Sequence, residues 1–395
     1  MELSKRALSI SPSSTLAIDA KAKKMKADGI DIIGFGAGEP DFDTPDHIKA
    51  AAIKAINDGF TKYTPASGTL ELKKAICSKF LKDNGLDYKP SNIVISNGAK
   101  HSLVNAFEAI LNPGDEVIIP APFWVSYPEM VKIAGGTPVI LNSTEEEGFK
   151  LSIEKLQKAI NPKTKAIVIN SPSNPTGMIY SEDELRAIAD IAVSKEIFVI
   201  SDEIYEKLIY DGYKHVSIAS FNDKIKDLTI IVNGVSKSYS MTGWRIGYTA
   251  SNEKIANIMS NVQSHATSNP NSIAQKAAQA GLEGPDDVIN MMASEFVKRR
   301  DYMVDRISSI NGLSCLKPNG AFYVMMNISK LIGKEINGVK ISGSDDFANL
   351  LLEKANVALV PGSGFGTDIH VRLSYATSLE NIKEGLNRIE NFLNK

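Results

Sequence analysis

Two apolar runs, Ala166-Ile-Val-Ile-Asn170 and Ile197-Phe-Val-Ile-Ser201, flank a stretch of helical periodicity over residues 181–194. Short runs rich in β-branched residues are typical of strands that are buried on both faces. Two such strands joined by a helix form the unit from which parallel sheets are built. Because this order of strand and helix recurs along the chain, we expect an α/β protein with a mainly parallel sheet and helices on both faces.

Further segments extend the same pattern. A helix is expected from Thr44-Pro45 to Asp58, with Thr44 as N-cap and Pro45 in the first position, because proline is favoured there. Other helices are expected at 99–109, 152–160 and 252–264. The remaining strand candidates of this region are Ile93–Ser96, Glu116–Ile119, Pro138–Leu141, Thr229–Val232 and Arg245–Thr249. In such a sheet, ligands bind beyond the carboxyl ends of the strands.

The pattern changes beyond about residue 285. A long charged helix over 286–310 is followed by candidate strands at 321–325, 357–360 and 371–374, with helices near 345–354 and at the C-terminus. A chain of 395 residues also exceeds one typical domain. We therefore predict a large domain of residues 46–285 and a small α+β domain built from residues 1–45 and 286–395.

The composition excludes several classes of protein. A net charge of −2 with interspersed basic and acidic residues argues against nucleic acid or a membrane surface as the main partner. Cys77 and Cys315 form no CxxC motif, and the five histidines lack metal-ligand spacing, so no metal is expected. The first ten residues lack the continuous apolar core of a signal peptide, which favours a cytoplasmic location.

One lysine lies among small hydroxylated residues in the stretch Gly234-Val-Ser-Lys-Ser-Tyr-Ser-Met-Thr-Gly-Trp-Arg-Ile-Gly-Tyr248. Lys237 in this setting suits an imine bond to a carbonyl cofactor, while Ser236 and Arg245 hold the phosphate of that cofactor. A lysine in an ordinary polar turn is the alternative when this stretch is taken alone.

Two polar segments follow neighbouring predicted strands. Ser171-Pro-Ser-Asn-Pro-Thr-Gly177 is a proline-stiffened turn that directs Asn174 outward, although Asn-Pro is also common in turns without function. Ser201-Asp-Glu-Ile-Tyr205 places Asp202 at the end of a strand. A carboxylate there is a helix cap, a metal ligand or the partner of a pyridinium nitrogen.

Three more segments have both a functional and a structural interpretation. The turn Ser96-Asn-Gly-Ala-Lys100 precedes a helix and so offers N–H groups to a phosphate, or simply allows close backbone packing. Trp124 offers a flat surface for stacking, or packs in the core. Arg372, within the apolar strand 371–374, pairs with an internal carboxylate or with that of a ligand.

Together these motifs resemble the class I/II aminotransferases that use pyridoxal phosphate, in particular the bacterial aspartate aminotransferase subgroup. The resemblance covers essentially the whole chain, in order. The motifs are Gly36-Ala-Gly-Glu-Pro-Asp-Phe-Asp-Thr-Pro45, Tyr63-Thr-Pro65, Pro122-Phe-Trp-Val-Ser-Tyr-Pro-Glu129, Ser173-Asn-Pro-Thr-Gly177, Ser201-Asp-Glu-Ile-Tyr205, the Lys237 stretch and Val371-Arg-Leu-Ser-Tyr-Ala376. The resemblance implies fold type I, with a mixed, mostly parallel seven-stranded sheet, a small α+β domain, and a homodimer whose active sites lie at the interface.

The same resemblance implies a role for each site residue. Lys237 binds pyridoxal 5'-phosphate covalently and moves a proton at the substrate α-carbon, and Asp202 keeps the pyridine nitrogen protonated. The other implied contacts are Asn174 and Tyr205 to the phenolic oxygen, Trp124 stacked on the ring, Ala99, Lys100, Ser236 and Arg245 at the phosphate with Tyr63 of a neighbouring subunit, and Arg372 with the Gly38 backbone at the substrate α-carboxylate.

The implied reaction moves the amino group of an amino acid, with L-aspartate favoured, to 2-oxoglutarate. Ser11 departs from a lysine that some relatives carry before Pro-Ser, which weakens the choice of an acidic substrate. The candidates for binding a second carboxylate are Lys5 or Arg6, or Lys100 or His265 from across a dimer interface. Aromatic, alanine-type or prephenate substrates, a β-lyase reaction, and a regulatory protein with a degenerate enzyme fold are the alternatives.

Overall fold

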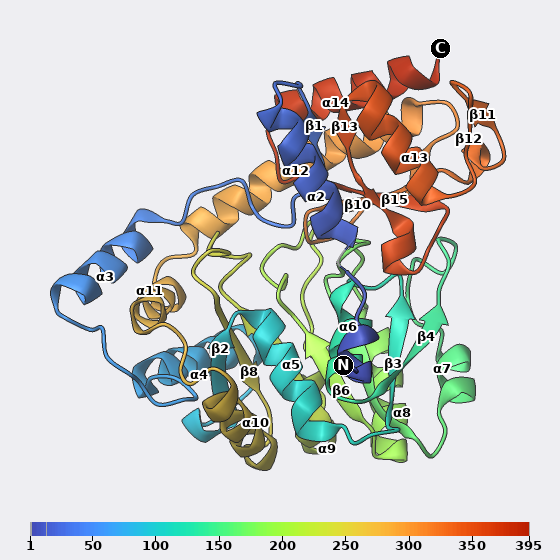
Figure 1. The fold of residues 1–395 in the computed structure, drawn as a ribbon. Coiled ribbons are helices and arrows are strands. Elements are labelled where there is room, and N and C mark those ends of the chain that lie inside the picture. Colours follow the sequence, from blue (N-terminus) through green and yellow to red (C-terminus); the bar gives the residue numbers. More distant parts are fainter. Residues whose placement is uncertain (1, 13, 395) are drawn as a thin grey trace.

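The computed structural model describes residues 2–12 and 14–394, which form two lobes (Figure 1). The larger lobe is built around a seven-stranded sheet. Its strands, in spatial order, are β2 (Ile93–Asn97), β8 (Ile246–Ala250), β7 (Thr229–Gly234), β6 (Phe198–Asp202), β5 (Thr164–Asn170), β3 (Glu116–Ala121) and β4 (Thr137–Asn142). Strand β8 pairs antiparallel with both of its neighbours, and the other pairs are parallel.

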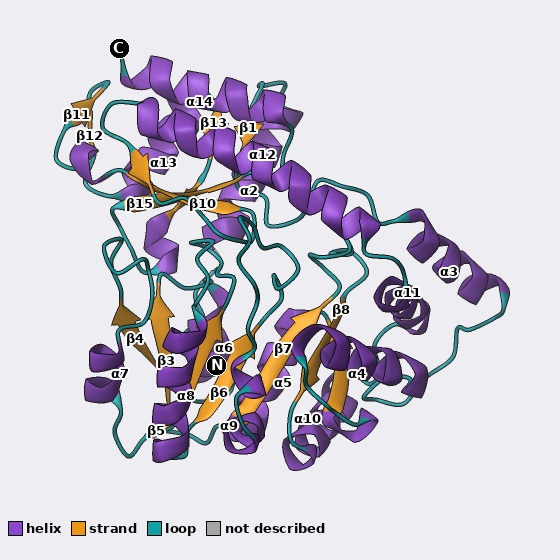
Figure 2. Ribbon diagram, turned by 180° about the vertical axis from the view of Figure 1, so that it is seen from behind, coloured by secondary structure: helices purple, strands orange, loops and turns teal. Residues whose placement is uncertain are grey.

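Helices cover both faces of this sheet, so its strands are buried on both sides (Figure 2). In β5, Ile167 and Ile169 pack with α8 (Glu182–Lys195), whereas Ala166 and Val168 belong to the core on the opposite face. This alternation has the period of two expected for a strand, and it explains the nearly unbroken apolar run. The other helices of this lobe are α3 (Asp46–Asn57), α4 (Leu70–Asn84), α5 (Ala99–Ile110), α6 (Ser126–Ile133), α7 (Ile153–Ala159), α9 (Asp223–Leu228), α10 (Glu253–Ala266) and α11 (Ser272–Glu283).

The second lobe has a four-stranded antiparallel sheet of order β14 (Val360–Pro361), β15 (His370–Ser374), β10 (Tyr323–Asn327) and β9 (Ser314–Cys315). Helices α12 (Asp287–Ser309), α13 (Ser344–Leu350) and α14 (Leu379–Leu393) pack around it, and β11 (Glu335–Ile336) pairs with β12 (Val339–Lys340). Arg372 therefore lies in a central strand, paired with both Met325 and Val360.

The N-terminal segment contacts both lobes. Strand β1 (Ile33–Gly34) pairs in parallel with β13 (Val357–Ala358), and α2 (Ser14–Ala27) packs beside them through Ile18 and Ala22. The short helix α1 (Lys5–Leu8) lies instead against α6 of the larger lobe. The domain boundaries at residues 45 and 285 stay a prediction.

Some expected element ends differ from the structure. Thr44 is not the N-cap of α3, because Pro45 occupies that position and the Thr44 hydroxyl is engaged elsewhere. It accepts a hydrogen bond from Nε1 of Trp244 at 2.9 Å and donates one to the Ser240 carbonyl at 2.7 Å. The segment near α3 is thus tied to the Lys237 stretch. The strand expected at 357–360 is divided between β13 and β14.

In the described part of the chain, none of the helices is both long enough and apolar enough to cross a membrane.

Candidate functional site

A cavity of about 530 Å³ lies at the carboxyl ends of the central strands. It is lined by Asn170 and Asp202 from the ends of β5 and β6, by the turn after β7, and by Tyr323 and Arg372 from β10 and β15. The cavity therefore collects residues from both lobes, at the edge of the sheet where ligands bind in α/β proteins.

Lys237 is held in this cavity by the turn that follows β7. Its Nζ donates a hydrogen bond to the carbonyl oxygen of Gly38. Burial lowers the pKa of Lys237 to about 8, and the positive charges of Arg245 and Arg372 act in the same direction, while Glu39 opposes them. The neutral amine is consequently far more abundant near neutral pH than for an ordinary lysine, which favours a role as nucleophile or general base.

Asp202, the last residue of β6, is buried and points into the cavity. Its Oδ2 accepts a hydrogen bond from the Tyr127 hydroxyl at 2.7 Å, and its Oδ1 accepts one from the Ile204 amide at 3.2 Å. Burial raises the pKa of Asp202 to about 6, against the lowering effect of these two hydrogen bonds. A buried carboxylate of this kind is stabilised by a positively charged ligand atom.

Arg372 forms the end of the cavity next to the second lobe. Its Nη1 donates to Oδ1 of Asn174 at 2.9 Å and its Nη2 donates to the Gly36 carbonyl at 3.0 Å. The Nε atom is buried and has no hydrogen-bond partner among the described residues. Because an unpaired buried N–H group is costly, this guanidinium is suited to receiving a carboxylate.

The opposite end of the cavity is shaped by two glycines. Gly98 has a φ of +85°, and a Cβ there would collide with the guanidinium of Arg245. A Cβ on Gly247 would collide with the Ala99 amide nitrogen. The absence of side chains at both positions lets Arg245 and the first amides of α5 lie close together, which is the arrangement of an anion site at a helix N-terminus.

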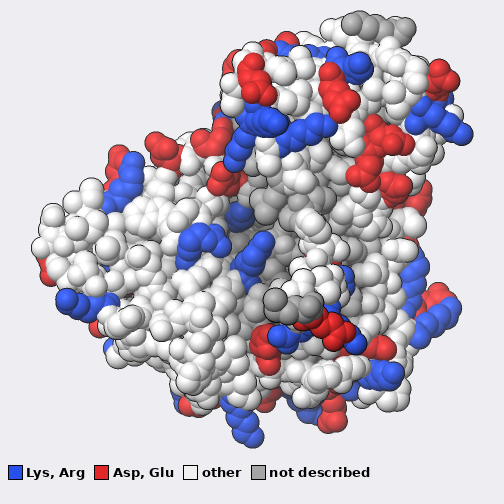
Figure 3. Space-filling view, viewed as in Figure 1, with Lys and Arg blue, Asp and Glu red and all other residues white. Residues whose placement is uncertain are grey.

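The charges around the cavity are mostly positive, and basic side chains are visible in the hollow between the lobes (Figure 3). Among the described residues, the cations that line it are Lys23, Lys100, Lys237, Arg245 and Arg372, and the acids are Glu39 and Asp202. Such an excess of positive charge favours ligands that carry phosphate and carboxylate groups.

A family model for "Aminotransferase class I and II" matches residues 30–389 of this chain. This match includes both ends of the cavity described above. The chain belongs to the class I and II aminotransferases. Because that family is one of enzymes, the cavity is the candidate active site of an aminotransferase.

Similar proteins agree with this assignment over their full length. The aspartate aminotransferase of Bacillus subtilis is 53% identical over 395 residues, which cover all of both chains. The aspartate/prephenate aminotransferase of Nitrosomonas europaea is 48% identical over 396 residues, again with full coverage of both. The crystal structure of the aspartate aminotransferase from Rhizobium meliloti has a TM-score of 0.97 at 45% identity, covering 100% of this chain and 99% of that one.

A second solved structure, the aspartate aminotransferase of Thermus thermophilus with maleate, has a TM-score of 0.94 at 42% identity and full coverage of both chains. These structures, together with the seven-stranded mixed sheet, confirm the predicted α/β fold of type I. The family match likewise confirms that the protein is an aminotransferase.

The structure of this aminotransferase brings together most of the residues that the sequence singled out. The predicted site residues that line the cavity are Gly38, Ala99, Lys100, Trp124, Asn174, Asp202, Tyr205, Ser236, Lys237, Arg245 and Arg372. Tyr63 does not line it, and 91% of its surface is exposed. Tyr63 was expected to act from a neighbouring subunit, so its role stays a prediction, as do the roles of the others.

The single chain shows which candidates for binding a second carboxylate line its own cavity, while a contribution from across a dimer interface stays a prediction. Lys100 lines the cavity, with its Nζ 5.0 Å from the centre of the Trp124 ring, whereas Lys5, Arg6 and His265 do not. Ser11 uses its backbone amide to donate to Glu129 at 2.9 Å.

Sequence reasoning missed several cavity residues of this aminotransferase. Tyr127, three residues after Trp124, was interpreted only as part of a motif, although it donates to Asp202. Tyr323 shares a hydrogen bond of 2.9 Å with the Tyr205 hydroxyl. Lys23 reaches the cavity from α2, a helix that was not predicted, so no sequence signal pointed to it.

Proposed function

We propose that this enzyme uses pyridoxal 5'-phosphate to transfer the amino group of L-aspartate to 2-oxoglutarate, in two half-reactions at one site. The observation that supports this most is the common cavity of Lys237, Asp202 and Arg372, which provide a low-pKa amine, a buried carboxylate and an incompletely paired guanidinium. These three groups match the needs of an aldehyde, a ring nitrogen and a substrate carboxylate.

The cavity fits this cofactor at both of its polar ends. Ser236, Arg245 and the Ala99 and Lys100 amides would hold the phosphate, in the cradle that Gly98 and Gly247 leave open. Asp202 would face the ring nitrogen, Asn174 and Tyr205 the phenolic oxygen, and Trp124 the ring. When bound, the cofactor supplies an electron sink for the negative charge that develops at the substrate α-carbon.

Lys237 is the residue that we assign to proton transfer. Its lowered pKa makes the neutral amine far more accessible than that of an ordinary lysine, so it would accept a proton from the substrate α-carbon and return one. Asp202 holds the ring nitrogen in its protonated form. Tyr127 donates to one oxygen of that carboxylate and the Ile204 amide to the other, and the two bonds together orient it.

Arg372 is the residue that we assign to the substrate α-carboxylate. Its guanidinium is already oriented by Asn174 and Gly36, so little side-chain entropy is lost when a carboxylate binds. The backbone of Gly38 lies beside it in the same cavity wall. Binding at this point would hold the substrate in the cavity that Lys237 also lines.

The proposal of aspartate rests on the names of the relatives and on two further cations. Lys100 and Lys23 line the cavity in addition to Arg372 and Arg245, and a second carboxylate in a closed site needs a positive partner. Steady-state rates with aspartate, alanine and phenylalanine as donors to 2-oxoglutarate test the choice. Negligible turnover of aspartate alongside rapid turnover of another donor would contradict it.

A second candidate substrate is prephenate as amino acceptor, because several relatives are named aspartate/prephenate aminotransferases. Aspartate consumption with prephenate in place of 2-oxoglutarate tests this directly. The Lys237→Ala variant is the control for both reactions, since it is expected to abolish them.

We also propose that two copies of the chain share their active sites. Tyr63 is 91% exposed in the single chain, although the family resemblance gives it a phosphate contact in a neighbouring subunit. Light scattering after gel filtration is expected to give a mass of about twice 42.8 kDa. A monomer of full activity would contradict the shared site.

A further inference from the structure

At the end of β6 and in the turn after it, residues that line the cavity are followed by buried glutamates that do not. Asp202 and Tyr205 line the cavity, and each is followed directly by a glutamate, Glu203 or Glu206, that does not. Both glutamates are buried, with 1% and 8% of their surface exposed. Buried carboxylates are costly unless they are paired, so their partners are informative about what the turn requires.

Glu203 is fully engaged on the side away from the cavity. Its Oε1 accepts hydrogen bonds from Ser201 at 2.8 Å and Ser217 at 2.7 Å. Its Oε2 lies 2.9 Å from Nε2 of His215, a side chain that is 8% exposed. Burial alone would lower the pKa of His215, but the charge of Glu203 outweighs it and raises that pKa. Glu203 is thus fixed by an ion pair and two hydroxyls.

Glu206 is anchored by a different set of partners. Lys79 of α4 forms a buried ion pair with its Oε1, which also accepts from Asn233 at 2.7 Å. Asn84 donates to its Oε2 at 3.0 Å. Burial opposes ionisation of Glu206, yet Lys79 and His215 hold its pKa at about 2. The turn is therefore attached to α4 and to the end of β7.

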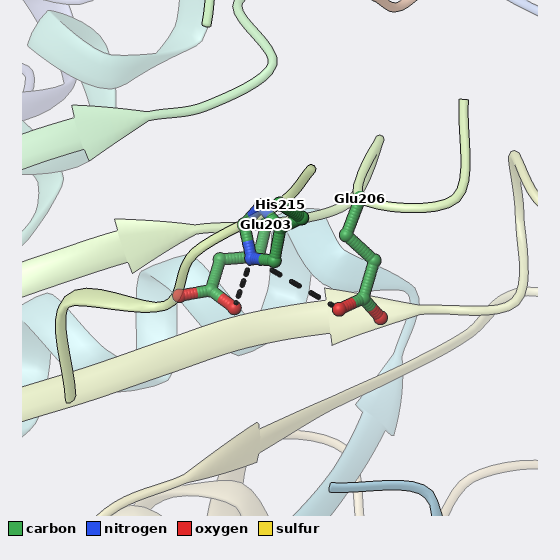
Figure 4. A group of neighbouring side chains, drawn as sticks. All are labelled: Glu203, Glu206 and His215. Atoms are coloured by element: carbon green, nitrogen blue, oxygen red, sulfur yellow. Dashed lines mark hydrogen bonds and ion pairs between the residues drawn. The ribbon is translucent and has the colours of Figure 1, made fainter. Parts of the chain in front are cut away.

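The two anchors meet at His215, as the close-up shows (Figure 4). Its Nε2 lies 2.9 Å from Glu203 and 4.0 Å from Glu206. Atoms of these three residues lie within 4.8 Å of one another, a spacing that also occurs in metal sites. Glu206 is already paired with Lys79 and Glu203 with His215, so each carboxylate has a protein partner that a metal ion would have to displace.

We propose that these two buried ion pairs are positioning devices for the cofactor contacts: His215–Glu203 orients Asp202, and Lys79–Glu206 orients Tyr205. The proposal rests on the proposed function, in which Asp202 faces the ring nitrogen and Tyr205 the phenolic oxygen. In both cases the anchored residue directly follows the cavity residue, so a shift of its backbone moves the preceding side chain. Neither anchor touches the cavity itself.

Binding of cofactor analogues to the cofactor-free enzyme tests this assignment. A 1-deaza analogue of pyridoxal phosphate lacks the ring nitrogen, and a 3-deoxy analogue lacks the phenolic oxygen. The test variants each remove both members of a pair, Glu203→Gln with His215→Gln and Lys79→Met with Glu206→Gln, so that no buried charge is left unpaired. The measured quantity is the ratio of dissociation constants of analogue and natural cofactor.

We expect each variant to lose its discrimination against one analogue and to keep its discrimination against the other. The Glu203/His215 variant should lose about tenfold of its preference for the natural cofactor over the 1-deaza analogue, since a misaligned hydrogen bond to a charged group loses at least that much. Its preference over the 3-deoxy analogue should stay within twofold. The Lys79/Glu206 variant should behave in the opposite way. Equal losses for both analogues would indicate a general structural role and overturn the proposal.

The control is the ion pair of Lys155 and Glu147, which are 2.7 Å apart and lie outside both the turn after β6 and the cavity lining. The variant Lys155→Gln with Glu147→Gln should leave both ratios unchanged, and a shift equal to that of the test variants would also overturn the proposal. The variant Asp202→Asn distinguishes the proposed cofactor contact of Asp202 from the proposed positioning role of His215–Glu203. If this variant leaves the 1-deaza ratio of the native enzyme unchanged, the proposed cofactor contact fails. If it changes that ratio and the Glu203/His215 variant does not, the positioning role alone fails.

Discussion

Arg372 donates a hydrogen bond of 2.9 Å to Asn174, a residue 198 positions earlier in the chain. The contact joins β15 of the second lobe to the proline-rich turn after β5, and it orients the guanidinium for a ligand carboxylate. Nε of Arg372 has no partner among the described residues, so the guanidinium is incompletely paired there. Asn174 thus supports the guanidinium that we propose for the substrate carboxylate, in addition to the cofactor contact expected of it.

Replacing this guanidinium tests the carboxylate site. Arg372→Lys keeps the charge but loses the paired donors, so kcat/KM for every amino acid donor should fall about a hundredfold, mainly through KM. Steady-state kinetics provide the measurement. Arg306→Lys, on the surface of α12 with Glu390 as partner, is the control and should have native kinetics. A fall confined to dicarboxylic donors would place Arg372 at the second carboxylate instead.

Gly98 provides a test of the phosphate end. In Gly98→Ala the new methyl group collides with Arg245, so we expect the affinity for pyridoxal phosphate to fall at least tenfold. Gly114 has a similar φ, +93° against +85°, but nothing lies within 4 Å of its Cβ position. Gly114→Ala therefore reproduces the backbone strain without the collision. Titration of the cofactor-free variants measures both affinities, and equal losses would show that strain alone is responsible.

The strands of the large sheet were predictable because burial on both faces leaves a simple signature. In β5 and β7 nearly every position is apolar or β-branched, and the expected limits of β5 differ from the observed ones only at its first residues. Helices α4 and α11 were missed although they bury apolar residues. Their polar positions, such as Lys79 and Gln275, are buried too, so the alternation of apolar and polar faces is blurred.

The site was predictable where a residue belongs to a motif after a strand. Asp202 ends β6, while Lys237 and Asn174 follow β7 and β5, and these neighbouring strands bring the three residues to one edge of the sheet. Tyr127 and Tyr323 were not assigned, because their partners lie 75 and 118 residues away and only the tertiary structure pairs them. Thr44 shows the same limit. The local sequence predicted it as a helix N-cap, but its hydroxyl instead binds Trp244 and Ser240, which are distant in the chain.

Substrate choice can be tested at Lys100 and Lys23, the two additional lysines that line the cavity. Lys100→Gln should lower the ratio of kcat/KM for aspartate over alanine about tenfold, because alanine has no second carboxylate to lose a partner. Lys23→Gln should also lower it, since Lys23 lines the same cavity and adds positive charge there. Lys24→Gln, on the same helix but outside the cavity lining, should leave the ratio unchanged. An unchanged ratio in both cavity variants would exclude these lysines as carboxylate partners.

The raised pKa of Asp202 predicts how the folding stability of the cofactor-free protein depends on pH. Burial raises its pKa from 3.8 to about 6, so between those values the folded chain binds this proton more tightly than the unfolded chain does. Stability from this group is therefore complete below about pH 4, falls as the pH rises to about 6, and stays low above it. The cost at pH 7 is on the order of 2–3 kcal/mol.

Asp202→Asn removes this titration, so the cofactor-free variant should be more stable than the native protein above pH 6 and nearly equal to it at pH 4. Urea denaturation at a series of pH values measures the difference. Asp305→Asn, an exposed aspartate on α12, is the control and should follow the native curve. With pyridoxal phosphate bound the order should reverse, because the native carboxylate then has a cationic partner. Parallel curves for native protein and Asp202→Asn would mean that Asp202 ionises in the folded chain as it does in water.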